Sequence, residues 1–277
     1  MSYKTIVVHC DSDKTIANRL SVATELAEKF GSTLVGLHAR PPLELPGLDV
    51  GMDPTPFVRA YEKTSKADQD SAHAAFDKAV KGKGVPSEWR QIDGFADEVL
   101  ATNARYADLL VLGQTNEEDI NPTPGDLPES LAIATGRPVI VVPHAGTQRH
   151  TGKTVMLCWN ASRESALAAT EAMPVLQAAE KVIILIVDPR PSENGHGAEP
   201  GADVATWLAR HGVKATVQRE VAADVDVGNI ILSRAADYGV DLIVMGVYGH
   251  SRVREWMLGG ASRTMLASMT VPVLMAH

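Results

Sequence analysis

The segment VDLIVMG, residues 240–246, is an apolar run that ends in a glycine, and it has a close copy, ADLLVLG, at residues 107–113. Similar pairs of segments precede and follow these two copies. YKTIVVHCDSD at 3–13 matches GKTVMLCWNAS at 152–162, and GRPVIVVPH at 136–144 matches MTVPVLMAH at 269–277. Because the three matches occur in the same order, they indicate an internal duplication of the chain.

Each half alternates short apolar segments with amphipathic ones, which predicts alternating strands and helices. In the first half we expect strands at 5–10, 33–39, 87–93, 108–113 and 138–143, and helices at 16–30, 57–80, 96–106 and 128–135. In the second half we expect strands at 155–159, 181–187, 214–220, 241–246 and 271–276, and helices at 164–179, 202–211, 227–238 and 262–268. Strands joined by helical crossovers run parallel, with helices on both faces.

The pattern therefore predicts an α/β fold of two tandem, open, five-stranded parallel sheets of Rossmann-like type, one in residues 1–145 and one in residues 152–277. The last predicted strands of the halves, PVIVVP at 138–143 and VPVLMA at 271–276, are apolar throughout. An uncovered edge of this kind promotes aggregation, so we expect these two strands to pair with each other.

The composition is that of an ordinary globular protein, with 277 residues, 45% hydrophobic residues and a net charge of −8. A negative chain disfavours general binding to nucleic acid or to anionic membranes, which needs dense positive charge. The N-terminus, MSYKTIVVHC, has no export signal, so a cytoplasmic location is expected. Cys10 and Cys158 are too few for a disulfide framework or a zinc site, and we expect both to be buried thiols.

A loop with four glycines, Gly246, Gly249, Gly259 and Gly260, connects the predicted strand 241–246 to the helix 262–268. In a parallel sheet of this type, ligands bind beyond the carboxyl ends of the strands. Glycine lets a phosphate approach the main-chain N–H groups, and the N-terminus of a helix adds free N–H groups and partial positive charge. The loop therefore predicts a phosphate site.

The spacing Gly-x2-Gly-x9-Gly after an apolar strand resembles the phosphate loop of the universal stress protein family. The openings of both halves, where a strand enters an Asp or Asn turn, and the VPVLM segment near the end are similar to that family too. The likeness covers both halves. It implies a tandem member with adenine nucleotide alpha hydrolase-like domains and with ATP, accompanied by Mg²⁺ and no other metal, held at the sheet end.

Carried over by position, the resemblance places Gly246, Gly249 and Gly259 at the phosphates and Asn160 near the adenosine, where the family usually has aspartate. Gly260 stands where ATP-binding members commonly have Ser or Thr. Its N–H remains and the hydroxyl is lost, but the hydroxyl of Ser262 lies two residues further on. The second half is therefore the expected nucleotide-binding domain.

The corresponding loop of the first half, residues 113–130, keeps Gly113 and Gly125 but has four acids where phosphate would lie: Glu117, Glu118, Asp119 and Asp126. Like charges at this range repel each other. Asp11 matches the family's opening aspartate, but we expect the first half not to bind ATP in the same way.

Three functions stay open. The first is a non-enzymatic binding and signalling module of the stress response, in which the halves form an internal pseudo-dimer and the whole chain is a possible homodimer. The second is a slow ATP hydrolase or phosphotransfer protein that uses His250 or Glu255 as a base. The third is a scaffold for another small ligand, with the Pro- and Gly-rich segment 40–56 either as a lid or as a simple insertion.

His144 and His150 have no acid or cysteine beside them in the sequence, so no metal site is expected there.

Overall fold

The computed structural model of the chain describes residues 2–43, 53–115, 127–145, 150–189, 199–247 and 260–277. The elements of the first half are β1 (Thr5–His9), α1 (Ile16–Phe30), β2 (Thr33–Arg40), α2 (Thr55–Val80), β3 (Ser87–Asp93), α3 (Ala96–Ala104), β4 (Leu109–Gly113), α4 (Leu127–Ala134) and β5 (Val139–Val142). The elements of the second half are β6 (Thr154–Cys158), α5 (Arg163–Glu171), α6 (Met173–Ala178), β7 (Lys181–Val187), α7 (Ala202–Arg210), β8 (Ala215–Glu220), α8 (Val227–Asp237), β9 (Leu242–Gly246), α9 (Gly260–Ser268) and β10 (Val273–Ala276).

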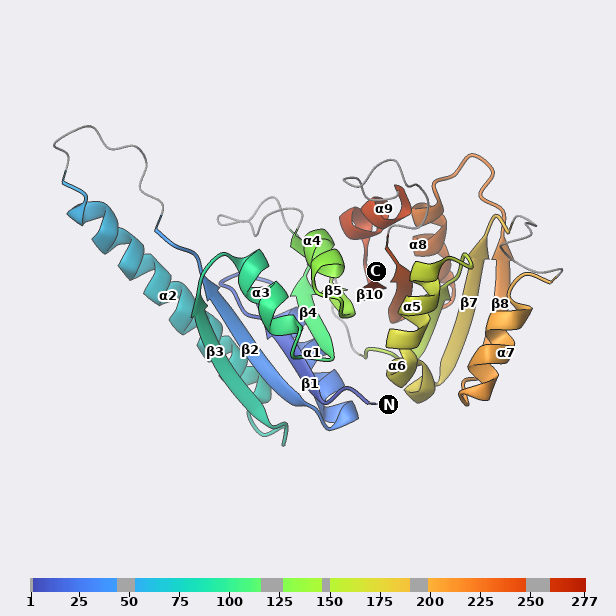
Figure 1. Cartoon of the computed structure of the whole chain (residues 1–277), viewed down its shortest axis with the longest axis horizontal. Coiled ribbons are helices and arrows are strands. Elements are labelled where there is room, and N and C mark those ends of the chain that lie inside the picture. Colours follow the sequence, from blue (N-terminus) through green and yellow to red (C-terminus); the bar gives the residue numbers. More distant parts are fainter. Residues whose placement is uncertain (1, 44–52, 116–126, 146–149, 190–198, 248–259) are drawn as a thin grey trace.

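The described strands form one ten-stranded sheet in the order β3-β2-β1-β4-β5-β10-β9-β6-β7-β8 (Figure 1). Neighbouring strands within each half are parallel. The halves meet through β5 and β10, which pair antiparallel with Val141 opposite Val273. The predicted α/β fold and the predicted pairing of the terminal strands are both confirmed. The two five-stranded sheets are thus joined edge to edge.

The strands are apolar because helices cover both faces of the sheet, and alternate side chains enter different cores. One core contains Ile6 and Val8 of β1 and runs along one face of the sheet to residues of α1, α2, α5, α6 and α7. The core of the other face contains Val7 and includes residues of α3, α4, α8 and α9. Of the outermost strands, β3 is largely exposed and β8 is partly exposed, and both carry charged residues, which discourages pairing with another chain.

The predicted helix 164–179 is wrong as a single element, because the structure divides it into α5 and α6 at Ala172. Pro174 explains the break, since proline has no N–H to donate to the carbonyl of Thr170 one turn earlier. Residues 44–52, most of the segment considered as a lid, lie outside the described residues. Within the described part of the chain, no helix combines the length and hydrophobicity needed to cross a bilayer.

Candidate functional site

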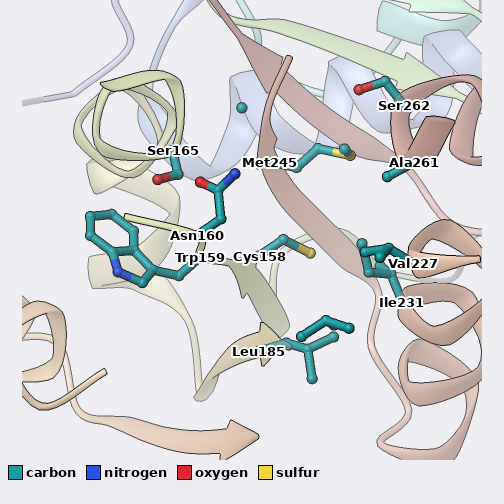
Figure 2. A pocket seen from close by; sticks show the side chains of 12 residues that line it. Cys158, Trp159, Asn160, Ser165, Leu185, Val227, Ile231, Met245, Ala261 and Ser262 are labelled. Atoms are coloured by element: carbon teal, nitrogen blue, oxygen red, sulfur yellow. The ribbon is translucent and has the colours of Figure 1, made fainter. Parts of the chain in front are cut away.

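A cavity of about 140 Å³ opens at the carboxyl ends of the central strands of the second half. Figure 2 shows its lining, with Asn160 and Ser165 on the side of α5 and Ala261 and Ser262 on the side of α9. The residues that line it are Cys158, Trp159, Asn160, Ser165, Leu185, Val187, Val227, Ile231, Met245, Gly246, Ala261 and Ser262. A parallel sheet places ligand sites at this edge.

Most of the lining is apolar, and it comes from the ends of β6, β7 and β9 and from α8. Val227 and Ile231 lie one helical turn apart on α8, so they point to the same side. Cys158 is half-buried and its side chain lines the cavity, which corrects the expectation of a fully buried thiol. Burial raises the pKa of this thiol to about 12, so it behaves as a neutral apolar group.

The turn between β6 and α5 fixes the polar side of the cavity. The Asn160 side-chain oxygen accepts a hydrogen bond from the Ser162 N–H at 3.1 Å, and Ala161 between them has a φ of 59°. Ser162 then caps α5, because its hydroxyl oxygen accepts from the N–H of Ser165 at 3.2 Å. Since the Asn160 oxygen is used locally, the NH₂ of its amide is the group left to bind a ligand.

Gly246 ends β9 at a point where no side chain fits. A Cβ there would lie 2.5 Å from the Glu164 carbonyl carbon and 2.6 Å from the Ser165 nitrogen. The first turn of α5 therefore packs directly on the end of β9. Sequence reasoning assigned this glycine to phosphate approach, and the structure adds a packing reason for it.

The first turn of α9 forms the opposite wall. Gly260 begins the helix, and the nearest atom to a Cβ placed there would be the Asp226 carboxylate oxygen at 3.6 Å. Asp226 caps α8 by accepting from the N–H groups of Gly228 and Asn229 at 2.9 and 3.3 Å. Ser262 is only 4% exposed and lines the cavity.

The structure thus brings together Asn160, Gly246 and Ser262 around one cavity, and it places Gly260 beside them at the start of α9. Gly249, Gly259, His250 and Glu255 lie outside the described residues. Sequence reasoning missed the apolar lining, because Leu185 or Ile231 cannot be told from a core residue by its pattern. Asp226 did carry a signal, since an acid directly before an apolar helix is typical of an N-cap.

In the first half, the equivalent position is filled by the chain itself. Asp11 begins the turn after β1, as Asn160 does after β6, and its carboxylate accepts from the Arg19 guanidinium at 2.6 Å. Arg19 is 2% exposed and lies against the end of β4, where a Cβ on Gly113 would be 3.3 Å from its central carbon. The duplication places Ala168 at the position of Arg19, so the second half has no such side chain.

The pKa values of Asp11 and His9 are both shifted at this site. Although burial by itself would raise the pKa of Asp11, the charge and hydrogen bonds of Arg19 hold that pKa well below its usual range. Burial lowers the pKa of His9 to about 4, against the pull of Asp11. The Nδ1 of His9 lies 3.3 Å from an Arg19 nitrogen, and only a neutral ring can accept a hydrogen bond there.

His150 has an acidic neighbour that the sequence did not reveal. It has no acid beside it in the sequence, but the fold places the Glu25 carboxylate 3.6 Å from its Nδ1. Across the described ranges, no three His, Cys, Asp or Glu side chains gather as metal ligands would.

The comparisons with known proteins agree with this architecture. Residues 152–277 match the model of the universal stress protein family. A search of curated proteins finds no relative of the chain at the sequence level. Among solved structures, the chain is similar to a universal stress protein from Archaeoglobus fulgidus, with 14% identity, coverage of 98% of this chain and 97% of that chain, and a TM-score of 0.70.

It is also similar to a functionally unknown protein from Pseudomonas aeruginosa, with 14% identity, coverage of 99% of this chain and 92% of that chain, and a TM-score of 0.62. At 14% identity, these two similarities establish only the fold of the whole chain. The family match on residues 152–277 adds the ancestry of the second half. The C-terminal half of the chain therefore belongs to the universal stress protein family, and the whole chain has the fold of a tandem, two-domain member.

Proposed function

We propose that this chain is a stress-response binding and signalling module of the cytoplasm that holds ATP or a related adenine nucleotide in its C-terminal half. The single observation that supports this most is the cavity between α5 and α9, because Asn160, Gly246 and Ser262 line it together. These residues were selected from the sequence for nucleotide binding. In this proposal the domains are residues 1–145 and 152–277, and only the second binds nucleotide.

The chemistry of the lining suits the parts of a nucleotide. Val187, Val227 and Ile231 present an apolar surface on which a flat base loses water favourably. The Asn160 amide can donate to a sugar or base oxygen or ring nitrogen. At the far wall, α9 begins at Gly260, and its first N–H groups have no intrahelical partners and favour an anion. Mg²⁺ would accompany the phosphates, which supply its oxygen ligands.

The electrostatics of the halves support one site per chain. In the first half, the Arg19 guanidinium fills the position next to Gly113 and is held by Asp11. A ligand there would have to displace a buried ion pair. In the second half, the duplication has the uncharged Ala168 in place of Arg19, and the main chain of α5 lies against Gly246 instead.

The experiment is a calorimetric titration of ATP into the wild-type chain and into two matched glycine variants. Gly249→Val should block the approach of phosphate to the main chain and weaken binding at least about tenfold, a loss of about 1.4 kcal/mol. The matched change in the first half, Gly125→Val, should leave affinity unchanged. Two equivalent sites, or a loss of affinity through Gly125→Val alone, would contradict the proposal.

A second candidate is a scaffold that holds a different small apolar ligand, and it is favoured by the predominance of apolar side chains in the cavity. A wild-type chain that gives no heat with ATP, and that retains another molecule through purification, would support it. Mass spectrometry of the material released on denaturation identifies that molecule. Phosphate release by the purified chain, lost with Gly249→Val, would instead support slow hydrolysis.

A further inference from the structure

Side chains of the first half donate hydrogen bonds to main-chain carbonyls of the second half. The Tyr3 hydroxyl donates to the Glu171 carbonyl at 2.8 Å, and the Lys29 ammonium donates to the Gly152 carbonyl at 2.9 Å. The Gln114 amide donates to the carbonyls of Leu266 and Ala267 at 2.7 and 3.3 Å. These contacts lie beside the β5–β10 junction that joins the halves.

The second half cannot make the equivalent contacts to the first half, because the residues that correspond to Tyr3 and Gln114 have no side-chain donor. In the register of the two halves, Tyr3 corresponds to Gly152 and Gln114 to Val247. Neither glycine nor valine has a side-chain donor. A larger residue is also excluded at Gly152, where φ is 78° and a Cβ would lie 2.7 Å from the Val175 side chain. The support therefore runs from the first half to the second.

Three of these four acceptors lie at the C-terminal ends of the two helices that frame the cavity. Glu171 is the last residue of α5, and Leu266 and Ala267 belong to the last turn of α9. The final carbonyls of a helix have no partner within it, so a donor from outside satisfies them. The opposite ends of the same helices carry Ser165 and Ser262, which line the cavity.

Gln114 is well suited to hold α9 in place. It is 5% exposed, and its own N–H donates to the Val142 carbonyl at 2.7 Å. Its side-chain oxygen accepts from the N–H of His144 at 3.1 Å while its side-chain nitrogen donates to α9. Because both ends of the amide are bonded, the side chain cannot turn without breaking a buried hydrogen bond.

A short helix transmits this constraint along its length. α9 has nine residues, so at 1.5 Å per residue its first and last Cα atoms are about 12 Å apart. A tilt at Leu266 and Ala267 displaces Gly260, Ala261 and Ser262 at the other end. The same holds for α5, whose first turn packs on Gly246 without room for a side chain.

We propose that the first half, which has its own equivalent position filled by Arg19, serves to position the nucleotide site of the second half. Tyr3 and Gln114 are the positioning residues, acting through α5 and α9. This inference rests on the proposed function for its affinity readout. Its structural readout is independent of any nucleotide.

The test compares Gln114→Leu and Tyr3→Phe with the wild-type chain in two measurements. Hydrogen exchange of the ligand-free chain should show faster exchange along α9 in Gln114→Leu and along α5 in Tyr3→Phe. Calorimetric titration should show ATP binding weakened by about three- to tenfold in either variant, the range expected from one buried hydrogen bond. Lys29→Met is the matched control, since it removes a donor at the same junction whose acceptor, Gly152, lies in neither helix.

Lys29→Met should lower the melting temperature without changing the ATP affinity. If Gln114→Leu lowers only the melting temperature, with exchange along α9 and affinity unchanged, the inference is wrong. If the wild-type chain binds no ATP, the proposed function fails, and the exchange measurement alone decides the inference. If Gln114→Leu does not fold, Tyr3→Phe, which deletes one oxygen atom, decides it in the same way.

Discussion

The Arg19 guanidinium and the Asp11 carboxylate form an ion pair at 2.6 Å in the first half, where the second half has Ala168 and Asn160. The side chain of Arg19 is 3% exposed and that of Asp11 is 23% exposed. The pair lies beside Gly113 at the end of β4. The first half therefore holds a buried ion pair at the end of its sheet, and the second half has a cavity at the corresponding end of its strands.

Removing both partners of this pair should cost less stability than the two single changes added together. Arg19→Ala should lower the free energy of unfolding by about 3 kcal/mol, since it leaves a largely buried carboxylate without its guanidinium. The double variant Asp11→Asn/Arg19→Ala reproduces the residues of the second half and should lose clearly less than the sum of the single changes. Urea denaturation of the four proteins in a double-mutant cycle measures the coupling, and strict additivity would contradict it.

Acid should destabilise the chain through His9. Its pKa is about 4 in the folded chain and about 6.5 when unfolded, so the unfolded chain binds the proton first. The neutral ring, surrounded by Asp11, Arg19, His38 and Asp13, stabilises the fold fully above pH 6.5, and this contribution is lost as pH falls from about 6.5 through about 4.

The measurement is the free energy of unfolding of wild type and His9→Asn between pH 7 and pH 4. The wild-type chain should lose about 2–3 kcal/mol more than the variant over this range. His211→Asn is the control, because that ring is exposed, and its profile should parallel the wild type. Parallel profiles for wild type and His9→Asn would show that His9 does not cause the loss.

The equivalent glycines of the halves should differ in their tolerance of a methyl group. Gly246→Ala places a Cβ 2.5 Å from main-chain atoms of α5, which cannot yield without moving the helix. Gly113→Ala places it 3.3 Å from the guanidinium of Arg19, at the end of a longer side chain. We expect Gly246→Ala to cost about 2–3 kcal/mol of stability and Gly113→Ala less. Equal costs in urea denaturation would refute the packing reason given for Gly246.

Filling the cavity should abolish ligand binding with little effect on folding. Ile231→Trp replaces an aliphatic side chain in the lining of the cavity with a larger indole ring that takes up its volume. We expect the ATP dissociation constant to rise more than about tenfold. Leu232→Trp, at the next position of α8, is the matched control, because Leu232 packs against the core and does not line the cavity. An unchanged affinity in Ile231→Trp would place the nucleotide elsewhere.

The sequence by itself determined the fold class and the position of the candidate site. Its duplicated segments and the alternation of apolar runs with amphipathic helices require parallel strands with helices on both faces, and this depends only on local periodicity. The glycines that begin with Gly246 pointed to the sheet edge at which the cavity opens, because glycine lets a ligand approach the main chain at the end of a strand. The pairing of β5 with β10 followed from two apolar edges that water disfavours.

The tertiary structure decided what depends on residues distant in the sequence. Arg19 reads as an ordinary helical residue, and only packing against Gly113 and Asp11 shows that it fills the site of the first half. The break between α5 and α6 and the bond from Gln114 to α9 were not predicted, and the latter joins residues 152 positions apart. Periodicity fixes which face of an element is buried, but the partner buried against it depends on the summed geometry of the whole chain.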